Sequence, residues 1–444
     1  MRTHQFGDWP GEFASKLMDA AAAVRLVQDG DRVCVPIGAI VPALSDALWA
    51  RREEVGTIDV LTCAPAYDPG WFEPGHPRFR VHVDVFNTVV GRNAWASHRV
   101  DFISIMFSRR FKEFDERGEE RRPADVVFVG VSPPDENGWC SFGVSAWNKG
   151  SFARRARTVI AEIIDNLPFT GGDNAIHVSE IDAFVPSGDP PAPRLLRETD
   201  VDMSAIAAHV RELIHHGDTI QIGTGLATMP LVTNGAFEGK EALGFHSEIS
   251  VAGMNQMVMS GQATGEKKTI HRGKYVSTAL LARTPEELAF INRNPIYEVY
   301  PVEYTNDPRV IAQHDNMVAI NNALAVDFVG QVASDSVGYD LWGGPGGQFE
   351  FAMGATMSRG GRSITVTPST TRDGAVSRIV PGHSPGTVVT VPRQVVDYVV
   401  TEWGIARLYE KSDRERAREL IAVAHPDHRE TLRRDAAKIF GVEP

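Results

Sequence analysis

One pattern occurs twice in this chain and limits the folds that it can adopt. The segment Gly30–Gly38 (GDRVCVPIG) is echoed by Gly217–Gly225 (GDTIQIGTG), and a proline follows each copy, at Pro42 and at Pro230. In both copies an amphipathic stretch leads through Gly-Asp into a short apolar strand and a glycine turn. We therefore expect two related halves, each of which opens as helix, strand, turn and helix.

Each half is expected to be an α/β domain. Short β-branched runs such as Val126–Val129 and Ser363–Val366 alternate with helical stretches, which is typical of largely parallel sheets. The polar, proline-rich segment Pro186–Pro193 is typical of a domain boundary. We therefore predict an N-terminal domain over residues 1–190 and a C-terminal domain over residues 191–444, each long enough to have its own core.

Composition and charge argue against several classes of protein. With 43% hydrophobic and 23% charged residues the composition is that of a globular protein, and no apolar run approaches the ~18 residues of a membrane span. The net charge of −12 argues against a nucleic-acid partner, because nucleic-acid-binding proteins usually carry a basic footprint. The N-terminus lacks the apolar segment of a secretory leader, and 3 dispersed cysteines do not indicate a disulfide framework. We therefore expect a cytoplasmic protein with no membrane partner.

Two segments carry the chemistry that we expect. Gly343–Gln348 (GGPGGQ) is rich in glycine, so its backbone can approach a ligand closely and its amide N–H groups can converge on a developing negative charge. Gly244–Glu248 (GFHSE) ends in a glutamate on a short polar turn, where a carboxylate can act as a nucleophile. Taken alone, each segment is equally compatible with a flexible loop or a solvated surface residue.

These two segments belong to a colinear series of strings that runs along most of the chain. The others are Val131–Ser145 (VSPPDENGWCSFGVS), Gly172–Asp182 (GDNAIHVSEID), Tyr304–Pro308 (YTNDP), Asp315–Asn321 (DNMVAIN), Gly330–Val332 (GQV), Val376–Pro381 (VSRIVP) and Val400–Ala406 (VTEWGIA). Together they resemble the family I coenzyme A transferases, specifically the branch of acetyl-CoA hydrolases and 4-hydroxybutyrate CoA-transferases. The resemblance implies two related open α/β domains of the CoA-transferase, NagB/RpiA-like type, with the active site in the cleft between them.

The resemblance also implies a covalent mechanism, because Glu248 matches the glutamate that forms the intermediate in this family. The carboxylate attacks the thioester carbonyl, the released CoA thiolate attacks the resulting anhydride, and the glutamyl-CoA thioester passes CoA to a second carboxylate. The amides of Gly346 and Gly347 are the donors that we expect to stabilise the oxyanions. The string departs from the family's usual pattern at Pro345, where an aliphatic residue is more common, and at Glu350, where Asp is more common.

Further residues are expected to bind the substrates. Gly223, Thr224 and Gly225 follow a strand and precede a probable helix, where backbone donors can face an anion or a carbonyl, although ordinary strand-to-helix packing explains them equally well. The remaining candidates for substrate and CoA binding are Gly343, Gly344, Gln348 and Asn321. No His or Cys spacing fits a zinc site, so no metal is expected, and the resemblance implies coenzyme A, as the acyl-CoA substrate. The basic run Ser108–Arg110 favours an anionic acceptor acid.

Four functions are compatible with these features, in descending order. The first is a CoA transferase that takes an acyl-CoA and a small carboxylic acid, and the second is an acyl-CoA hydrolase that uses the same glutamate with water as acceptor. The third is a catalytically silent CoA-binding protein, which Glu248 and the glycine-rich segment argue against. The fourth, a Rossmann dehydrogenase, lacks the G-x-G-x-x-G fingerprint in its strand–turn–helix context. The resemblance also implies a homo-oligomer.

Overall fold

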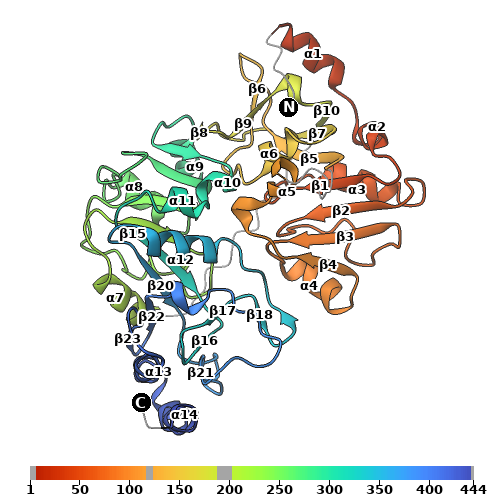
Figure 1. Cartoon of the computed structure of the whole chain (residues 1–444). Helices are drawn as coiled ribbons and strands as arrows, with labels where there is room; N and C mark the ends of the chain where they lie inside the picture. Colours follow the sequence, from red (N-terminus) through yellow and green to blue (C-terminus); the bar gives the residue numbers. More distant parts are fainter. Residues whose placement is uncertain (1–6, 117–123, 188–202, 442–444) are drawn as a thin grey trace. The chain divides into compact units, whose positions relative to one another are not determined.

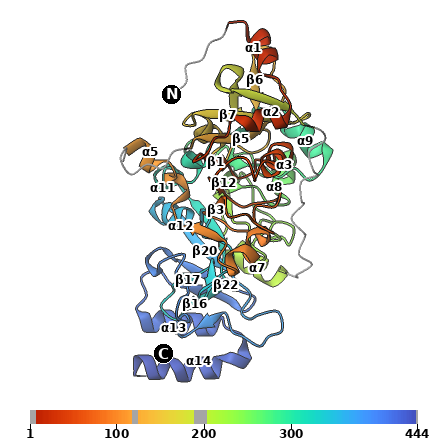
Figure 2. The ribbon, with the colours of Figure 1, turned by 90° about the vertical axis from the view of Figure 1, so that its right-hand side faces the viewer.

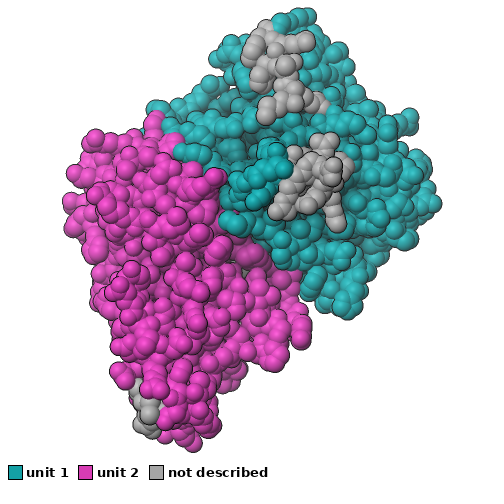
Figure 3. Space-filling model, in the orientation of Figure 1, with its two compact units in different colours: residues 1–195, 278–304 teal, residues 196–277, 305–444 magenta. Residues whose placement is uncertain are grey.

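A computed structural model describes residues 7–116, 124–187 and 203–441 of the chain. It divides into two compact units (Figure 3): unit 1 comprises residues 1–195 and 278–304, and unit 2 comprises residues 196–277 and 305–444. The chain therefore returns to unit 1 after the first part of unit 2. The domain junction expected at residues 190 and 191 lies outside the described residues and stays a prediction.

Unit 1 contains helices and strands, most of which are labelled in Figure 1. They are α1 (Trp9–Lys16), α2 (Ala20–Ala23), β1 (Arg32–Val35), α3 (Pro42–Ala50), β2 (Ile58–Thr62), β3 (Phe79–Asp84), α4 (Val89–Ala96), β4 (Val100–Ile103), α5 (Lys112–Glu116), β5 (Val126–Val131), β6 (Trp139–Ser141), α6 (Lys149–Ala153), β7 (Thr158–Ile163), β8 (Gly171–Gly172), β9 (Ala175–His177), β10 (Ala183–Pro186), α9 (Pro285–Ile291) and β14 (Tyr297–Val299). The chain passes between the units within β13 (Tyr275–Ala279) and α10 (Val302–Thr305).

Unit 2 contains the remaining elements. They are α7 (Ser204–Glu212), β11 (Thr219–Ile222), β12 (Gly244–Ile249), α8 (Met254–Met259), α11 (Pro308–Ile311), β15 (Met317–Asn322), β16 (Ala325–Asp327), β17 (Val332–Ala333), β18 (Ser336–Val337), β19 (Asp340–Leu341), α12 (Gln348–Met357), β20 (Arg362–Val366), β21 (Ile379–Val380), β22 (Tyr398–Thr401), β23 (Gly404–Arg407), α13 (Asp413–Ala422) and α14 (Pro426–Phe440).

The main sheet of unit 1 is parallel throughout and buried on both faces. Its strand order is β10-β7-β5-β1-β2-β3-β4. Successive side chains of a strand point to opposite faces, and in β5 Val126 and Phe128 join one core cluster while Val127 and Val129 join the other. Burial on both faces explains why β5 is apolar at every position, as the sequence indicated.

Unit 2 has the same kind of sheet. Strands β22, β20, β15, β11 and β12 run parallel in that order, and β23 adds an antiparallel edge. The C-terminal helices α13 and α14 lie next to one another (Figure 2) and contribute Leu420 and Leu432 to the core cluster that contains Val399 of β22. Both units are therefore α/β with parallel sheets, as the sequence predicted.

The repeated Gly-Asp segment occupies equivalent positions in the two units. Each copy leads into a central strand, β1 between β5 and β2 and β11 between β15 and β12. Asp31 accepts a hydrogen bond from the backbone N–H of Gln28, and Asp218 accepts one from His215, so each carboxylate closes the turn three residues before it. Each copy thus ends a helical stretch and starts the central strand of its sheet.

The expectation of a helix after the strand and its glycine turn is correct for the first copy and wrong for the second. Helix α3 begins at Pro42, but turns follow Pro230 up to Gly239. In the second copy Gly235 and Gly239 adopt φ values of 85° and 71°, which lie in the left-handed region and end any helical run.

Candidate active site

Glu248 lies at the carboxyl end of β12, beside the central strand of unit 2. Ligands of open parallel sheets bind at this edge, outside the carboxyl ends of the strands. The first four residues of β12 are fully enclosed, whereas the side chain of Glu248 keeps a partly exposed surface. The strand thus brings a carboxylate out of the core at the position where a substrate can reach it.

Two donors hold this carboxylate. The Nδ2 group of Asn306 donates a hydrogen bond to Glu248 Oε2, and the backbone N–H of Gly347 also donates to the carboxylate. A Cβ atom on Gly347 would lie 2.2 Å from Glu248 Oε2 and 2.2 Å from Asn306 Nδ2, so any side chain there would displace both groups. Gly346 has a φ of 51°, in the left-handed region that favours glycine. The glycine-rich segment and the glutamate are therefore in direct contact, through Gly347.

The environment of Glu248 makes its ionisation costly. Protein atoms surround most of the side chain, and this burial raises its pKa from 4.5 to about 7, while the hydrogen bonds from Asn306 and Gly347 oppose the shift. A carboxylate with little hydration is a better nucleophile than one in bulk water. At neutral pH a large fraction of Glu248 is thus both ionised and poorly hydrated.

Asn306 is in turn held from two sides. Its Nδ2 group also donates to Oε2 of Glu350, at 3.2 Å, and Glu350 lies in the first turn of α12. His246 fixes the backbone just before Asn306, because its Nε2 lies 2.8 Å from the carbonyl oxygen of Thr305. Burial lowers the pKa of His246 to about 3, so its ring is neutral and donates to this carbonyl through Nε2–H. His246 is two residues before Glu248 and lies on the same face of β12.

The other predicted binding residues lie at the same edge but are engaged with the protein. The amide of Gly223 donates to Ile320 O at 2.8 Å, and the amide of Gly225 donates to Thr228 Oγ1 at 2.9 Å. Thr224 lies between them in the turn after β11. In this structure the amides of Gly223 and Gly225 support the turn after β11, and a substrate-binding role for them stays a prediction.

Asn321 and Gln348 also bond within unit 2. Asn321 exchanges two amide hydrogen bonds with Gln221, at 3.0 and 3.1 Å, which pair β15 to β11 through their side chains. Gln348 Nε2 donates to Asn322 O at 3.0 Å, and the amide of Gly343 donates to Asp335 O at 3.2 Å. Gly344 lies next to Gly343, in the same loop before α12. The structure thus brings Glu248, Gly346 and Gly347 together, and most of the remaining predicted residues bond to other parts of unit 2.

Asn306 was not assigned to the site from the sequence, and Glu350 was noted there only as a departure from the family's usual pattern. Asn306 lies in the string Tyr304–Pro308, and Glu350 follows the glycine-rich segment by two residues, so both were close to recognised motifs. Nothing in either string indicates that a single amide joins two carboxyl groups. Their contact depends on how β12, α12 and the turn that contains Asn306 come together within unit 2.

The arginines of the basic run Ser108–Arg110, in unit 1, both form ion pairs with carboxylates. Arg110 Nε lies 2.7 Å from Asp84 Oδ2, and both residues are buried. Arg109 forms an ion pair with Glu116. The expectation that Ser108–Arg110 favours an anionic acceptor acid is therefore not supported, because both guanidinium groups are already paired with carboxylates of the same unit.

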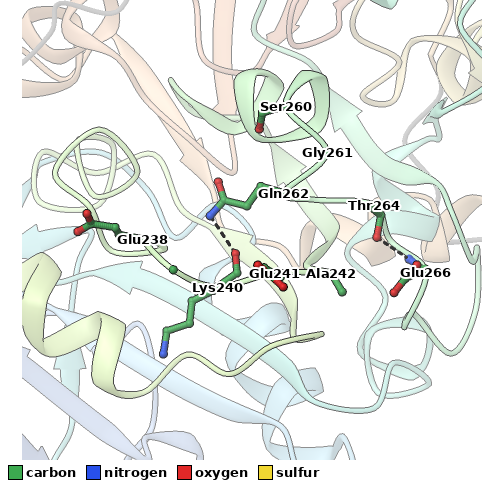
Figure 4. A pocket seen from close by; sticks show the side chains of 10 residues that line it. Glu238, Lys240, Glu241, Ala242, Ser260, Gly261, Gln262, Thr264 and Glu266 are labelled. Atoms are coloured by element: carbon green, nitrogen blue, oxygen red, sulfur yellow. Dashed lines mark hydrogen bonds between the residues drawn. The ribbon is translucent and has the colours of Figure 1, made fainter.

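A surface pocket of about 630 Å³ lies elsewhere in unit 2. Figure 4 shows its lining, which includes Glu238, Lys240, Glu241, Gln262 and Glu266. The pocket lies beside the residues that precede β12, at the end of the strand opposite to Glu248. Gln262 donates to Lys240 O at 3.1 Å and so belongs to the wall of the pocket. This pocket is separate from the carboxylate site.

The described part of the chain shows no group of three or more His, Cys, Asp and Glu side chains that could hold a metal ion. Within that same part, every helix is too short or too polar to cross a membrane.

Comparison with known proteins gives matches over nearly the whole chain. Residues 2–193 match the family model "Acetyl-CoA hydrolase/transferase N-terminal domain", and residues 284–436 match the model "Acetyl-CoA hydrolase/transferase C-terminal domain". A 4-hydroxybutyrate coenzyme A transferase of Clostridium kluyveri is 38% identical over 98% of this chain and 100% of its own length. A succinyl-CoA:cyclohexane-1-carboxylate CoA transferase of Geobacter metallireducens is 34% identical over 96% of each chain.

Two solved structures are similar over the same extent. RipA from Yersinia pestis is 31% identical and aligns with a TM-score of 0.89, over 98% of this chain and 99% of its own. A 4-hydroxybutyrate CoA-transferase from Porphyromonas gingivalis is 32% identical and aligns with a TM-score of 0.79, over 98% of this chain and 100% of its own. These likenesses confirm the type of fold that the resemblance implied.

Proposed function

The chain belongs to the acetyl-CoA hydrolase/transferase family and is an enzyme that transfers CoA between an acyl-CoA and a carboxylic acid; we propose that it does so by a ping-pong reaction through a glutamyl-CoA thioester on Glu248. The observation that carries this proposal is the geometry at Glu248. A poorly hydrated carboxylate at the carboxyl edge of the sheet is held by an asparagine amide and by a backbone N–H of a glycine loop. Such donors suit a carboxylate whose oxygens become parts of tetrahedral oxyanions.

The proposed reaction has two symmetrical halves. Glu248 Oε1 attacks the acyl carbonyl, the C–S bond breaks, and CoA leaves as a thiolate, which gives an acyl-glutamyl anhydride. The thiolate then attacks Cδ of Glu248 and expels the acyl group as a free carboxylate, leaving the glutamyl-CoA thioester. The acceptor carboxylate repeats both steps in reverse and regenerates the ionised Glu248. No step consumes or releases a proton, so the reaction requires no general base.

The donors around Glu248 have distinct roles in this scheme. When the thiolate or the acceptor attacks Cδ, negative charge develops on Oε2, to which Asn306 already donates. The N–H of Gly347 adds a second donor on the same carboxylate. We assign the oxyanion of the acyl carbonyl, formed in the other steps, to the neighbouring amide of Gly346. Donors of this kind typically contribute a factor of roughly 10² to 10³ in kcat.

The same intermediates would hydrolyse an acyl-CoA if water replaced the acceptor acid. Relatives that match nearly the whole chain are named CoA transferases, which supports transfer as the main reaction. The resemblance continues to predict a homo-oligomer and an active site that takes an acyl-CoA and a small carboxylic acid, and the composition continues to predict a cytoplasmic location.

Trapping the intermediate tests the proposal directly. The purified protein is incubated with acyl-CoA donors of different chain lengths in the absence of acceptor, and borohydride then reduces any enzyme thioester. Peptide mass spectrometry should find the modified residue at Glu248, and Glu248→Ala should show none. An adduct on another residue, or transfer activity that persists in Glu248→Ala, would refute the assignment of Glu248 as nucleophile.

A further inference from the structure

The amide of Asn306 has to face Glu248 with its NH2 group, because only that end can donate to a carboxylate. The two hydrogens of Nδ2 have two acceptors, Oε2 of Glu248 and Oε2 of Glu350. The other end, Oδ1, is buried and has no hydrogen-bond partner among the described residues. All the hydrogen bonds that the described residues make with this side chain are therefore on its donor end.

The backbone that carries Asn306 is independently fixed. Thr305 and Asn306 are fully buried, and the hydrogen bond from His246 holds the carbonyl between them. The main freedom left to the side chain is rotation of its amide, which exchanges Nδ2 with Oδ1. Two carboxyl oxygens disfavour this rotation, since it would place the acceptor Oδ1 against Glu248 and Glu350 together.

Glu350 is well placed to oppose the rotation. Its side chain is 2% exposed, and it is the third residue of α12, where the helix dipole favours negative charge. It follows Gly347, the N-cap residue of α12, by three positions, so one short segment supplies both a donor to Glu248 and the acceptor that orients Asn306. Any shift of this helix start would move both groups.

We propose that Glu350 is a positioning residue for the transfer reaction, which acts by fixing the amide of Asn306 with its NH2 group toward Glu248. This rests on the proposed role of Glu248 as the nucleophile. Glu350 itself does not touch the reacting atoms in this scheme. Its effect on the rate passes entirely through Asn306, and this sets it apart from a residue that only supports the fold.

A double-mutant cycle tests this. In Glu350→Gln the new amide can either accept from Nδ2 or donate to Oδ1, so both orientations of Asn306 become acceptable. We expect kcat to fall roughly 10-fold or more, the scale of a hydrogen bond to a charged group, with KM for acyl-CoA changing less than about threefold. In an Asn306→Ala background, Glu350→Gln should then change kcat by less than about twofold, since the amide that it orients is gone.

The readouts are steady-state kcat and the single-turnover rate of adduct formation on Glu248, each per folded protein as measured by a melting curve. Glu162→Gln is the matched control, because Glu162 is a fully buried glutamate that bonds Leu44 and Ser187 in unit 1. It should lower stability without lowering kcat. If Glu350→Gln does not fold, Glu350→Asp replaces it in the same cycle, since it shortens the side chain and lengthens the bond to Asn306.

These measurements distinguish the positioning role of Glu350 from the role of Glu248 as the nucleophile. Equal losses from Glu350→Gln in the wild-type and Asn306→Ala backgrounds would overturn the positioning role, and so would an unchanged kcat in the single variant. A wild-type protein that transfers CoA without a Glu248 adduct would refute the proposed mechanism instead. A strongly non-additive cycle in an enzyme that forms the adduct supports both.

Discussion

Replacing Glu248 by glutamine should make the protein more stable at alkaline pH. Glutamine keeps an oxygen that accepts from Asn306 and Gly347 but cannot ionise. Burial raises the pKa of Glu248 from 4.5 to about 7 in the folded state, so ionisation is more costly in the folded chain than in the unfolded one. The wild-type protein therefore loses stability as the pH rises from 4.5, and the loss is complete above about pH 7.

The size of this change in stability follows from the difference between the pKa of Glu248 in the folded and unfolded chains. The difference between 4.5 and about 7 corresponds to at most about 3–4 kcal/mol of unfolding free energy, at ~1.4 kcal/mol per pKa unit. Glu248 keeps a partly exposed surface and water screens part of its charge, so we expect ~1–2 kcal/mol. For a domain of the size of unit 2 this is a rise in Tm of roughly 2–8 °C.

Thermal melts of wild type and Glu248→Gln across pH provide the assay. The gain in Tm should be largest above about pH 8 and should shrink steadily below about pH 6. Glu266→Gln, which removes an exposed glutamate of the same unit, serves as the control and should change Tm little at any pH. A gain that is constant with pH, or a less stable Glu248→Gln protein at about pH 8.5, would show that the Glu248 carboxylate is not destabilised by burial.

Three further predictions concern turnover. The rate of adduct formation, measured in single turnovers, should rise with pH to a plateau with its midpoint near pH 7, because the nucleophile is the ionised form of Glu248. A midpoint near pH 4.5 would contradict this prediction. Glu248→Asp should lose roughly 10²-fold in kcat, since the shorter side chain withdraws the oxygen by about 1 Å, and steady-state assays at saturating acyl-CoA measure the loss. Gly347→Ala should lower kcat per folded enzyme more than Gly346→Ala does. A Cβ atom at Gly347 would lie 2.2 Å from Glu248 Oε2, whereas one at Gly346 would lie 3.9 Å from Oε1. Equal losses of kcat in paired assays of the two variants would argue against this packing.

Much of the architecture was predictable from local patterns. The repeated Gly-Asp segment indicated two related α/β units, and short β-branched runs such as Val126–Val129 indicated largely parallel sheets. Glu248 and Gly347 were both assigned to the site from the sequence, and the structure places them in contact. These predictions depend on residues close together in the chain or on strings long enough to be specific.

The rest depends on tertiary contacts that local patterns do not encode. Asn321 was expected to bind substrate because it is an amide in a recognised string, yet its neighbour across the sheet is Gln221, and the two amides satisfy each other. That pairing requires β15 to lie beside β11, which the order of the strands along the chain does not indicate. The link from Glu350 through Asn306 to Glu248 likewise joins three distant segments.

The return of residues 278–304 to unit 1 has a consequence for how the protein is made. Strand β14 pairs in parallel with β8, so a nascent chain has to be extended through β11 and β12 before β8 meets its partner. Until then unit 1 lacks part of its structure, and unpaired strand edges favour aggregation. A fragment cut at the proline-rich segment would carry this defect permanently, and a chimaera of two relatives would have to exchange residues 278–304 together with the N-terminal residues to keep β8 and β14 from the same parent.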